Sequence, residues 1–327
     1  MKKLGLALAG GGGRGAYQIG VWKALRDTGL DQYITAVSGT SVGGLNAALF
    51  IQNDLDKAQR IWESISKEQI LTPKSDSSHS PTRRSIYERD GLEKIIDDCL
   101  DMRCFDNSEY HCWMTCLCKD KDKEAAPRFE YERQTLPDGT KDIRRCVDND
   151  VEYFNLKYYD DEQRKQIILA TSAMPVFFPK EEINGHLYGD GGTKILGGDN
   201  VPVKPLYEID QCDLILIVHL RSMDEPVNRA EYPKATLYEI FPKKDLGSIL
   251  DFSAEGAKMR IQQGYDETIK LFQDIRELID LYDEYLQKLA ERYERMIEYA
   301  RLERKLDDEW EKLVRENRRI KNLGGTR

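Results

Sequence analysis

The sequence predicts an α/β fold with a mainly parallel sheet, followed by a long C-terminal helical extension. Three observations lead to this prediction. Several short apolar runs lack alternating polar residues, which is typical of strands covered on both faces. In the first 50 residues these runs alternate with helical stretches, and this order indicates parallel strands joined by right-handed crossovers. The last 73 residues have no such alternation and follow a heptad pattern instead.

The first four elements form a strand–helix–strand–helix unit. An apolar strand is expected over residues 4–9, where it runs into four glycines, and a helix is expected over 16–25. A second short strand over 34–37 leads through a Gly- and Ser-containing turn into a helix over 42–51.

The middle of the chain is more varied. Residues 72–90 are polar and contain Pro and Ser, so we expect a loop there, either a plain surface connection or a mobile flap. Helices are expected near 92–100 and over 163–173. Residues 110–156 alternate and are rich in β-branched and aromatic residues, with a turn at 136–139 between two strand-like runs. A last buried strand is expected at 214–218.

Charge divides the chain into two parts. The formal charge is −9, from 58 acidic and 49 basic residues, but the segment 255–327 holds 17 acidic and 16 basic residues and is nearly neutral. The acidic body therefore offers no electrostatic footprint for duplex nucleic acid. No apolar stretch approaches the roughly 20 residues that cross a bilayer. Seven cysteines without an export signal predict reduced thiols and a cytoplasmic location.

The tail reads as one long helix. From Tyr265 to Leu323 there is neither Gly nor Pro, and apolar positions from Ile261 to Ala300 step alternately by four and three residues, as in a coiled coil. A straight helix of this length would extend roughly 90 Å, so it must bend, fold back, or project and pair with another chain. We expect a catalytic domain over 1–250 and an extension over 251–327 that supports a homo-oligomer or packs on the body. The basic end of the chain is a candidate for transient contact with a membrane surface.

One candidate nucleophile lies in the second strand–helix turn. Gly39-Thr40-Ser41-Val42-Gly43 matches G-x-S-x-G with a strand before it and a helix after it. The glycines Gly39 and Gly43 allow a sharp turn that lifts the Ser41 hydroxyl out of the sheet, and the helix N-terminus favours a developing oxyanion. A tight turn without catalysis is the alternative interpretation.

The first strand–helix turn carries a glycine loop, Gly10-Gly11-Gly12-Gly13-Arg14-Gly15. It matches the dinucleotide pattern G-x-G-x-x-G, but the second strand ends in Ser38-Gly39-Thr40-Ser41 and offers no acid for a ribose. The successive N–H groups of such a loop also form an anion nest, which beside a serine would hold the oxyanion of an acyl transfer. A non-catalytic or nucleotide-binding module built on this loop, with the tail as an interaction element, remains the alternative.

A third glycine-flanked group, Asp190 in Gly189-Asp190-Gly191-Gly192, would supply the base. In this order the three motifs resemble the patatin-like family of lipid acyl hydrolases, of the bacterial type. The resemblance covers about residues 4–220 and extends to flanking stretches, namely Gly15-Ala16-Tyr17-Gln18-Ile19-Gly20-Val21, Ala170-Thr171-Ser172-Ala173-Met174-Pro175, Phe177-Phe178-Pro179 and Asp199-Asn200-Val201-Pro202-Val203.

The resemblance implies a three-layer α/β/α fold and a serine esterase that acts on phospholipid, lysophospholipid or another ester. Ser41 would be the nucleophile, and Asp190 would take its proton directly. The loop from Gly10 to Gly15, chiefly the N–H groups of Gly11 and Gly12 near Arg14, would hold the oxyanion until water releases the acyl-enzyme. Neither a histidine nor a metal or other cofactor is required.

Two other constellations are weighed and set aside. An α/β-hydrolase triad would add His219, but a nucleophile after only two strands comes too early for that fold, and His219 ends a buried strand where a core histidine is expected. His186 is expected at the surface. His111, Cys112, Cys116 and Cys118 invite a zinc interpretation, but strand alternation separates His111 from the cysteines, so we expect buried thiols.

Overall fold

The computed structural model describes residues 3–73, 85–106, 108–118 and 129–323. The chain divides into two compact units, Met1–Ile269 and Lys270–Arg327. The division of function at residue 250 stays a prediction, because compactness alone does not locate an activity.

The elements of the chain alternate between strands and helices from the start. In order they are β1 (Leu4–Leu8), α1 (Ala16–Asp27), β2 (Ile34–Thr40), α2 (Val42–Gln52), α3 (Leu55–Ser64), α4 (Lys67–Ile70), α5 (Asp90–Cys99), β3 (His111–Cys118), β4 (Phe129–Thr135), β5 (Lys141–Asp148), β6 (Val151–Asn155), α6 (Asp161–Thr171), β7 (Glu181–Ile183), β8 (His186–Asp190), α7 (Lys204–Glu208), β9 (Leu214–Val218), β10 (Thr236–Ile240) and α8 (Ala254–Leu323).

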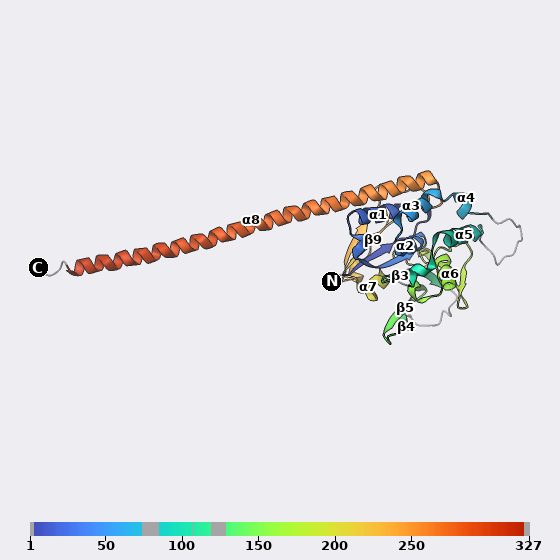
Figure 1. The fold of residues 1–327 in the computed structure, drawn as a ribbon, viewed down its shortest axis with the longest axis horizontal. Helices are drawn as coiled ribbons and strands as arrows, with labels where there is room; N and C mark the ends of the chain where they lie inside the picture. Colours follow the sequence, from blue (N-terminus) through green and yellow to red (C-terminus); the bar gives the residue numbers. More distant parts are fainter. Residues whose placement is uncertain (1–2, 74–84, 107, 119–128, 324–327) are drawn as a thin grey trace. The chain divides into compact units, whose positions relative to one another are not determined.

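One sheet organises the first unit. Five parallel strands in the order β10-β9-β1-β2-β3 form its centre, and β6, β5 and β4 continue it as antiparallel neighbours. Helices α1, α2 and α6 lie on one face and α7 on the other (Figure 1). The predicted three-layer α/β/α fold with a mainly parallel central sheet is confirmed.

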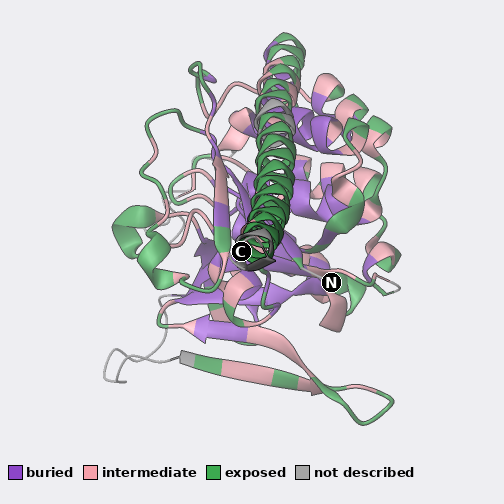
Figure 2. Cartoon of the chain, turned by 90° about the vertical axis from the view of Figure 1, so that its left-hand side faces the viewer, coloured by how far each residue is buried: buried purple, intermediate pink, exposed green. Residues whose placement is uncertain are grey.

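The apolar runs that predicted the strands lie in the centre of this sheet. All five residues of β1 are buried, and four of the five in β9. Figure 2 shows the central strands as buried, between helices that are exposed along their outer sides. A strand covered on both faces has no solvent side for polar residues, which explains the absence of alternation.

The register on β3 brings two strand ends together. β2 runs parallel to β3 and ends with Thr40 opposite Thr115. β8 runs antiparallel to β3 and ends with Asp190 opposite Cys116. Since Thr115 and Cys116 are consecutive, the carboxyl ends of β2 and β8 meet along β3, although about 150 residues separate them in sequence.

Most predicted elements have the expected place, with shifted ends. β2 continues to Thr40, three residues further than predicted, and α6 starts at Asp161 because Asp160 and Gln163 form a capping box. The turn at 136–139 is confirmed, with Leu136 N–H donating to Thr140 O at 2.8 Å. Of the predicted loop at 72–90, residues 74–84 lie outside the described residues. The short elements α3, α4, α7, β7, β8 and β10 were not predicted.

The last helix is one continuous element. α8 runs over 70 residues, from Ala254 to Leu323, and so contributes to both units. Seam side chains of the second unit are exposed, among them Leu286, Leu289, Tyr293 and Met296. Across the described residues, no helix combines the length and the apolar character that a bilayer span requires.

The first turns of α8 belong to the first unit and pack closely on α1. A side chain at Gly20 would overlap the carbonyl of Ile261, and one at Gly264 would overlap the carbonyl of Tyr17. The two helices are therefore in backbone contact at their crossing. Tyr17 OH donates to the Glu267 carboxylate at 3.0 Å beside this crossing.

A buried amide ties three helical segments together. Asn46 on α2 donates to Gly15 O at 2.9 Å and to the Gln18 side chain at 2.7 Å, and it accepts from Trp62 Nε1 at 2.9 Å. All three of its hydrogen-bonding partners lie on the face of the sheet that α1 and α2 cover, so Asn46 fixes α2 against α1 and α3.

We predict that Asn46→Ala lowers the free energy of unfolding by about 3 kcal/mol, because it leaves the Trp62 Nε1–H and Gln18 Oε1 buried without the hydrogen bonds that Asn46 makes to them. Urea unfolding followed by near-UV circular dichroism measures this change. The control Gln262→Ala removes an exposed amide and should shift stability by less than about 0.5 kcal/mol. Equal stability of the two variants would contradict the role of Asn46.

Candidate active site

Ser41 lies between β2 and α2 in a strained backbone conformation. Its φ is 55° and its ψ −126°, values that non-glycine residues rarely adopt. Gly43, two residues later, passes so close to the carbonyl of Leu8 that a side chain there would overlap it. The strand, the sharp turn and the helix together present the Ser41 side chain at the carboxyl edge of the sheet, as in a nucleophile elbow, although the residue as a whole is buried.

Asp190 lies at the end of β8, close enough to Ser41 for the Ser41 side chain to stabilise its carboxylate. The N–H of Gly192 donates to its Oδ1 at 2.8 Å. Burial raises the pKa of Asp190 to about 6, while the hydrogen bonds from Ser41 and Gly192 oppose that rise. A carboxylate with this pKa is ionised at neutral pH and is a stronger base than an ordinary aspartate.

The end of α6 holds both strand ends in place. The N–H of Ser41 donates to Thr171 Oγ1 at 3.0 Å, and the Thr171 hydroxyl donates to Thr115 O at 2.6 Å. The N–H of Asp190 donates to Ala173 O at 3.0 Å. Thr171 and Ala173 were noted in the sequence only as part of a familiar stretch, and nothing local in that stretch indicated which backbone groups they would bind.

The glycine loop lies next to Ser41 and has two unused amides. The N–H groups of Gly10, Gly13 and Arg14 donate to Asn200 O, Ile249 O and Gly11 O. Those of Gly11 and Gly12 donate to no protein acceptor in the part of the chain that the structure describes. Both of these glycines line the same pocket as Ser41, so the loop can offer two N–H donors to an anion there.

The side chains of two arginines tie this loop to neighbouring segments through backbone carbonyls. Arg14 donates through Nε to Gly247 O at 2.7 Å and does not appear among the pocket-lining residues that are described. Arg260, on α8, is buried and donates to Gly13 O at 3.2 Å and to Leu246 O at 2.7 Å. It also pairs with the Asp251 carboxylate. The support by Arg260 was missed in the sequence, where this residue appeared only as part of a charge-dense tail.

A pocket of about 410 Å³ opens above Ser41 and Asp190. The glycine loop forms part of its lining, and five further segments complete it. These segments contribute Met174 and Pro175, Gly192 to Ile195, Asn200, Arg221 with Asp224, and Ile249. The chemical groups gathered here are a hydroxyl, a carboxylate beside it and two unused amides, which is the set that acyl transfer needs.

The sequence model of the family described as Patatin-like phospholipase matches residues 6–207, more than half of the chain. This match includes the glycine loop, Ser41 and Asp190. The chain belongs to the patatin-like phospholipase family.

Individual relatives are more distant. A segment of 52 residues is 44% identical to the protein described as lysophospholipase nte1 of Aspergillus terreus, and it covers 16% of this chain and 3% of that protein. The crystal structure of VipD from Legionella pneumophila matches 84% of this chain and 67% of its own, with 14% identity and a TM-score of 0.41.

The human GIVD cytosolic phospholipase A2 structure is similar in fold, with a TM-score of 0.51 and 10% identity, and the match covers 84% of this chain and 59% of that one. The chain thus spans a small part of the fungal relative and about three fifths of the human structure.

The two histidines considered as catalytic candidates, His219 and His186, have other places in this patatin-like chain. As predicted, His219 is buried at the end of β9, where Nε2 contacts the Glu239 carboxylate at 2.9 Å and the ring stacks on Phe241. His186 lies at the start of β8, four residues before Asp190. Neither histidine is among the described residues that line the pocket.

The four candidate zinc ligands of β3, His111 and three cysteines, have different surroundings. His111 contacts the carboxylates of Asp210 and Asp142, at 2.5 and 3.0 Å. Cys112 and Cys116 are buried, and burial raises the pKa of both thiols well above the ordinary value. Cys118 is buried as well, so the predicted buried thiols are confirmed for all three cysteines.

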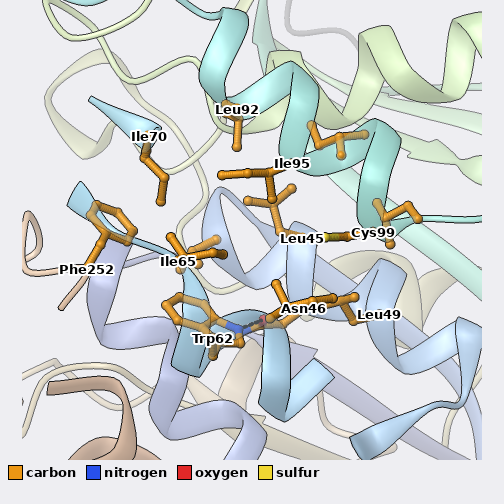
Figure 3. A pocket seen from close by; sticks show the side chains of 14 residues that line it. Leu45, Asn46, Leu49, Trp62, Ile65, Ile70, Leu92, Ile95, Cys99 and Phe252 are labelled. Carbon is orange, nitrogen blue, oxygen red and sulfur yellow. Dashed lines mark hydrogen bonds between the residues drawn. The ribbon is translucent and has the colours of Figure 1, made fainter. Parts of the chain in front are cut away.

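A second, apolar cavity adjoins the helix that begins after Ser41 (Figure 3). It measures about 60 Å³ and is lined by residues of α2, α3 and α5 and by Phe252. The lining residue nearest to Ser41 in sequence is Val42. Its polar member, Asn46, is already bonded to Trp62. Among the described residues none lines both this cavity and the pocket, so the cavity lies apart from the reacting groups.

We predict that turnover of a soluble ester depends on pH through Asp190. Below about pH 6 the carboxyl is protonated and cannot accept the Ser41 proton, so kcat/KM should fall about tenfold per pH unit there and level off above about pH 7. Hydrolysis of a short-chain p-nitrophenyl ester measures the profile, with circular dichroism at each pH as the control for folding. A flat profile between pH 4.5 and 8 would contradict the role of Asp190.

Proposed function

We propose that this protein is a serine lipid acyl hydrolase of the phospholipase A, lysophospholipase or esterase type. The observation that carries the proposal is the placement of Ser41 beside Asp190, a buried carboxylate with a raised pKa, in one pocket that the unused amides of Gly11 and Gly12 also line. Membership of the patatin-like phospholipase family supports an ester of a lipid as the substrate.

In the proposed mechanism Asp190 accepts the proton of the Ser41 hydroxyl as Oγ attacks the ester carbonyl. The carbonyl oxygen becomes an oxyanion and receives hydrogen bonds from the N–H groups of Gly11 and Gly12. Collapse of this intermediate breaks the ester C–O bond, and the leaving alcohol takes the proton back from Asp190. Water then attacks the acyl-enzyme and gives a proton to Asp190. Collapse of the second intermediate breaks the bond between Ser41 Oγ and the acyl carbon, Asp190 returns the proton to Ser41 Oγ, and the fatty acid is released.

The competing interpretation is a nucleotide-binding module on the loop from Gly10 to Gly15. The amides of Gly10, Gly13 and Arg14 are engaged within the protein, and the end of β2 presents Thr40 and Ser41 in place of an acid for a ribose. These observations favour acyl transfer over dinucleotide binding.

We predict that Ser41→Ala and Asp190→Asn each lower kcat for a p-nitrophenyl ester by at least about 1,000-fold, since each removes one half of the dyad. A fluorophosphonate probe should label the wild type and leave Ser41→Ala unlabelled. Persistent labelling of Ser41→Ala, or an unlabelled wild type, would defeat the enzyme assignment.

The same assay separates a dyad from a triad. His219→Ala and His186→Ala serve as controls that should retain turnover, because neither ring lines the pocket. Loss of acylation in a folded His219→Ala protein would replace the dyad by a histidine-dependent mechanism.

We propose in addition that the second unit assembles as a coiled coil with another copy of this chain. Its support is the regular alternation of four- and three-residue steps, with Leu286, Leu289, Tyr293 and Met296 exposed on one stripe.

The alternative, contact of the basic end with a membrane surface, stays a prediction, and residues 324–327 of that end lie outside the described residues. The odd number of seven cysteines supports a reducing compartment, which we propose is the cytoplasm.

We predict that Leu289→Glu together with Met296→Glu converts the assembly to monomers, because two charges would have to be buried in the seam. Light scattering of the full-length protein measures the mass. The control pair Gln287→Glu and Lys288→Gln changes the net charge equally but lies off the seam, so it should keep the mass of the wild type. A monomeric wild type would remove the assembly proposal.

A further inference from the structure

Three turns around the active-site pocket each present a large apolar side chain to solvent. Val176 is 58% exposed, Ile195 97% and Met223 91%. Ile195 itself lines the pocket, and the sequence neighbours of the other two, Pro175 and Asp224, line it as well. The three side chains thus come from separate segments that converge on one pocket mouth. We call Val176, Ile195 and Met223 the apolar rim.

Val176 occupies a position that its residue type does not favour. The N–H of Phe177 donates to Met174 O at 3.1 Å, so Pro175 and Val176 are the central residues of a tight turn. The φ of Val176 is 75°, a value that glycine or asparagine adopts easily at this place and a β-branched residue does not. The turn is fixed further by Ile86 N–H, which donates to Val176 O at 2.8 Å. A strained residue that projects an apolar side chain outward suggests a function for that side chain.

The other two rim residues are also held by short structures. Ile195 is the middle residue of a 3₁₀ turn, Lys194–Leu196, that follows directly after Asp190 and its glycines. Met223 lies in a turn closed by the N–H of Asp224, which donates to Arg221 O at 3.4 Å. Solvent exposure of isolated apolar residues is common, but three such residues at the mouth of one pocket form a patch.

The exposed charges that line the mouth are cationic. Lys194 and Arg221 are both exposed and line the pocket. The acids that line it are turned inward: the Asp190 carboxyl is buried, and the Asp224 side chain is only 9% exposed and lies 3.8 Å from His219 Nδ1. Glu225, the next residue, is exposed but does not line the pocket. The exposed charges that line the mouth are therefore positive, whereas the formal net charge of the chain is −9.

We propose that the apolar rim, together with Lys194 and Arg221, docks the pocket mouth onto the surface of an anionic phospholipid bilayer. This inference rests on the proposed function, because a lipid ester must leave a bilayer to reach Ser41. The apolar rim inserts among the acyl chains near the headgroups, and the two cations lie at the level of the lipid phosphates. A membrane suits this patch better than a protein partner, since the patch surrounds an open pocket through which a substrate has to pass.

The test uses the full-length protein and the pair Val176→Asn and Met223→Gln, which removes two rim side chains that do not line the pocket. Asparagine tolerates the positive φ at position 176. The matched control pair, Tyr33→Asn and Met259→Gln, removes exposed apolar side chains that are also absent from the pocket lining. Binding is measured in a Ser41→Ala background, by co-sedimentation with sucrose-loaded vesicles of 70% phosphatidylcholine and 30% phosphatidylglycerol.

We expect the rim pair to lower the vesicle partition coefficient at least tenfold and the control pair to change it less than twofold. Pure phosphatidylcholine vesicles should bind the Ser41→Ala protein several-fold more weakly than the mixed vesicles. In proteins that retain Ser41, both pairs should hydrolyse a soluble p-nitrophenyl ester within twofold of the wild type.

Three results would overturn the inference or part of it. If the rim pair binds vesicles as well as the control pair does, or if Ser41→Ala binds no vesicles, the apolar rim is not a docking surface. Equal binding to both vesicle compositions removes the contribution of Lys194 and Arg221. Failure of the proposed function looks different: the Ser41-containing protein would leave the soluble ester intact while Ser41→Ala still binds vesicles through the rim.

Discussion

The meeting of β2 and β8 along one edge of β3 is the constraint on which the site depends. Because Thr40 pairs with Thr115 and Asp190 with Cys116, the residue after β2 and the last residue of β8 have to be neighbours. The hydrogen-bond ladder of the sheet sets the positions of Ser41 and Asp190, so their approach does not depend on the conformation of a loop. Sites built on strand ends are held more rigidly than sites carried by loops.

This arrangement has an energetic cost that the surrounding structure offsets. Ser41 is held at positive φ, and the Asp190 carboxylate is buried, with its charge stabilised by the Gly192 N–H and the Ser41 side chain. Such features persist where neighbouring segments over-determine them. Here Thr171 and Ala173, at and just after the end of α6, accept hydrogen bonds from the N–H groups of Ser41 and Asp190, and Arg260 binds the Gly13 carbonyl of the glycine loop. Packing of the helices on one face of the sheet thus keeps the basic carboxylate of Asp190 and the two unused amides of the glycine loop in a fixed geometry.

Sequence patterns were informative where the structure is local. Uninterrupted apolar runs located the central strands, and the flanks of Ser41 identified the turn that presents it. Asp190 was found only through a motif, since β8 is short, contains a glycine and pairs with a strand about 70 residues earlier. The roles of Thr171 and Arg260 could not be predicted, because each binds backbone groups that the chain brings close only after the sheet has formed. The apolar rim was also missed, since single apolar residues in separate turns carry no periodic signal.

The backbone contact between α1 and α8 at Gly20 and Gly264 has a consequence for how such proteins diverge. The match to the family model ends at residue 207, yet Arg260, which donates to the carbonyl of Gly13, lies in the helix that this contact fixes. An alanine at either glycine, normally favourable in a helix, would here separate two backbones and loosen the glycine loop. Substitutions in the matched region and in this later helix are therefore expected to depend on one another.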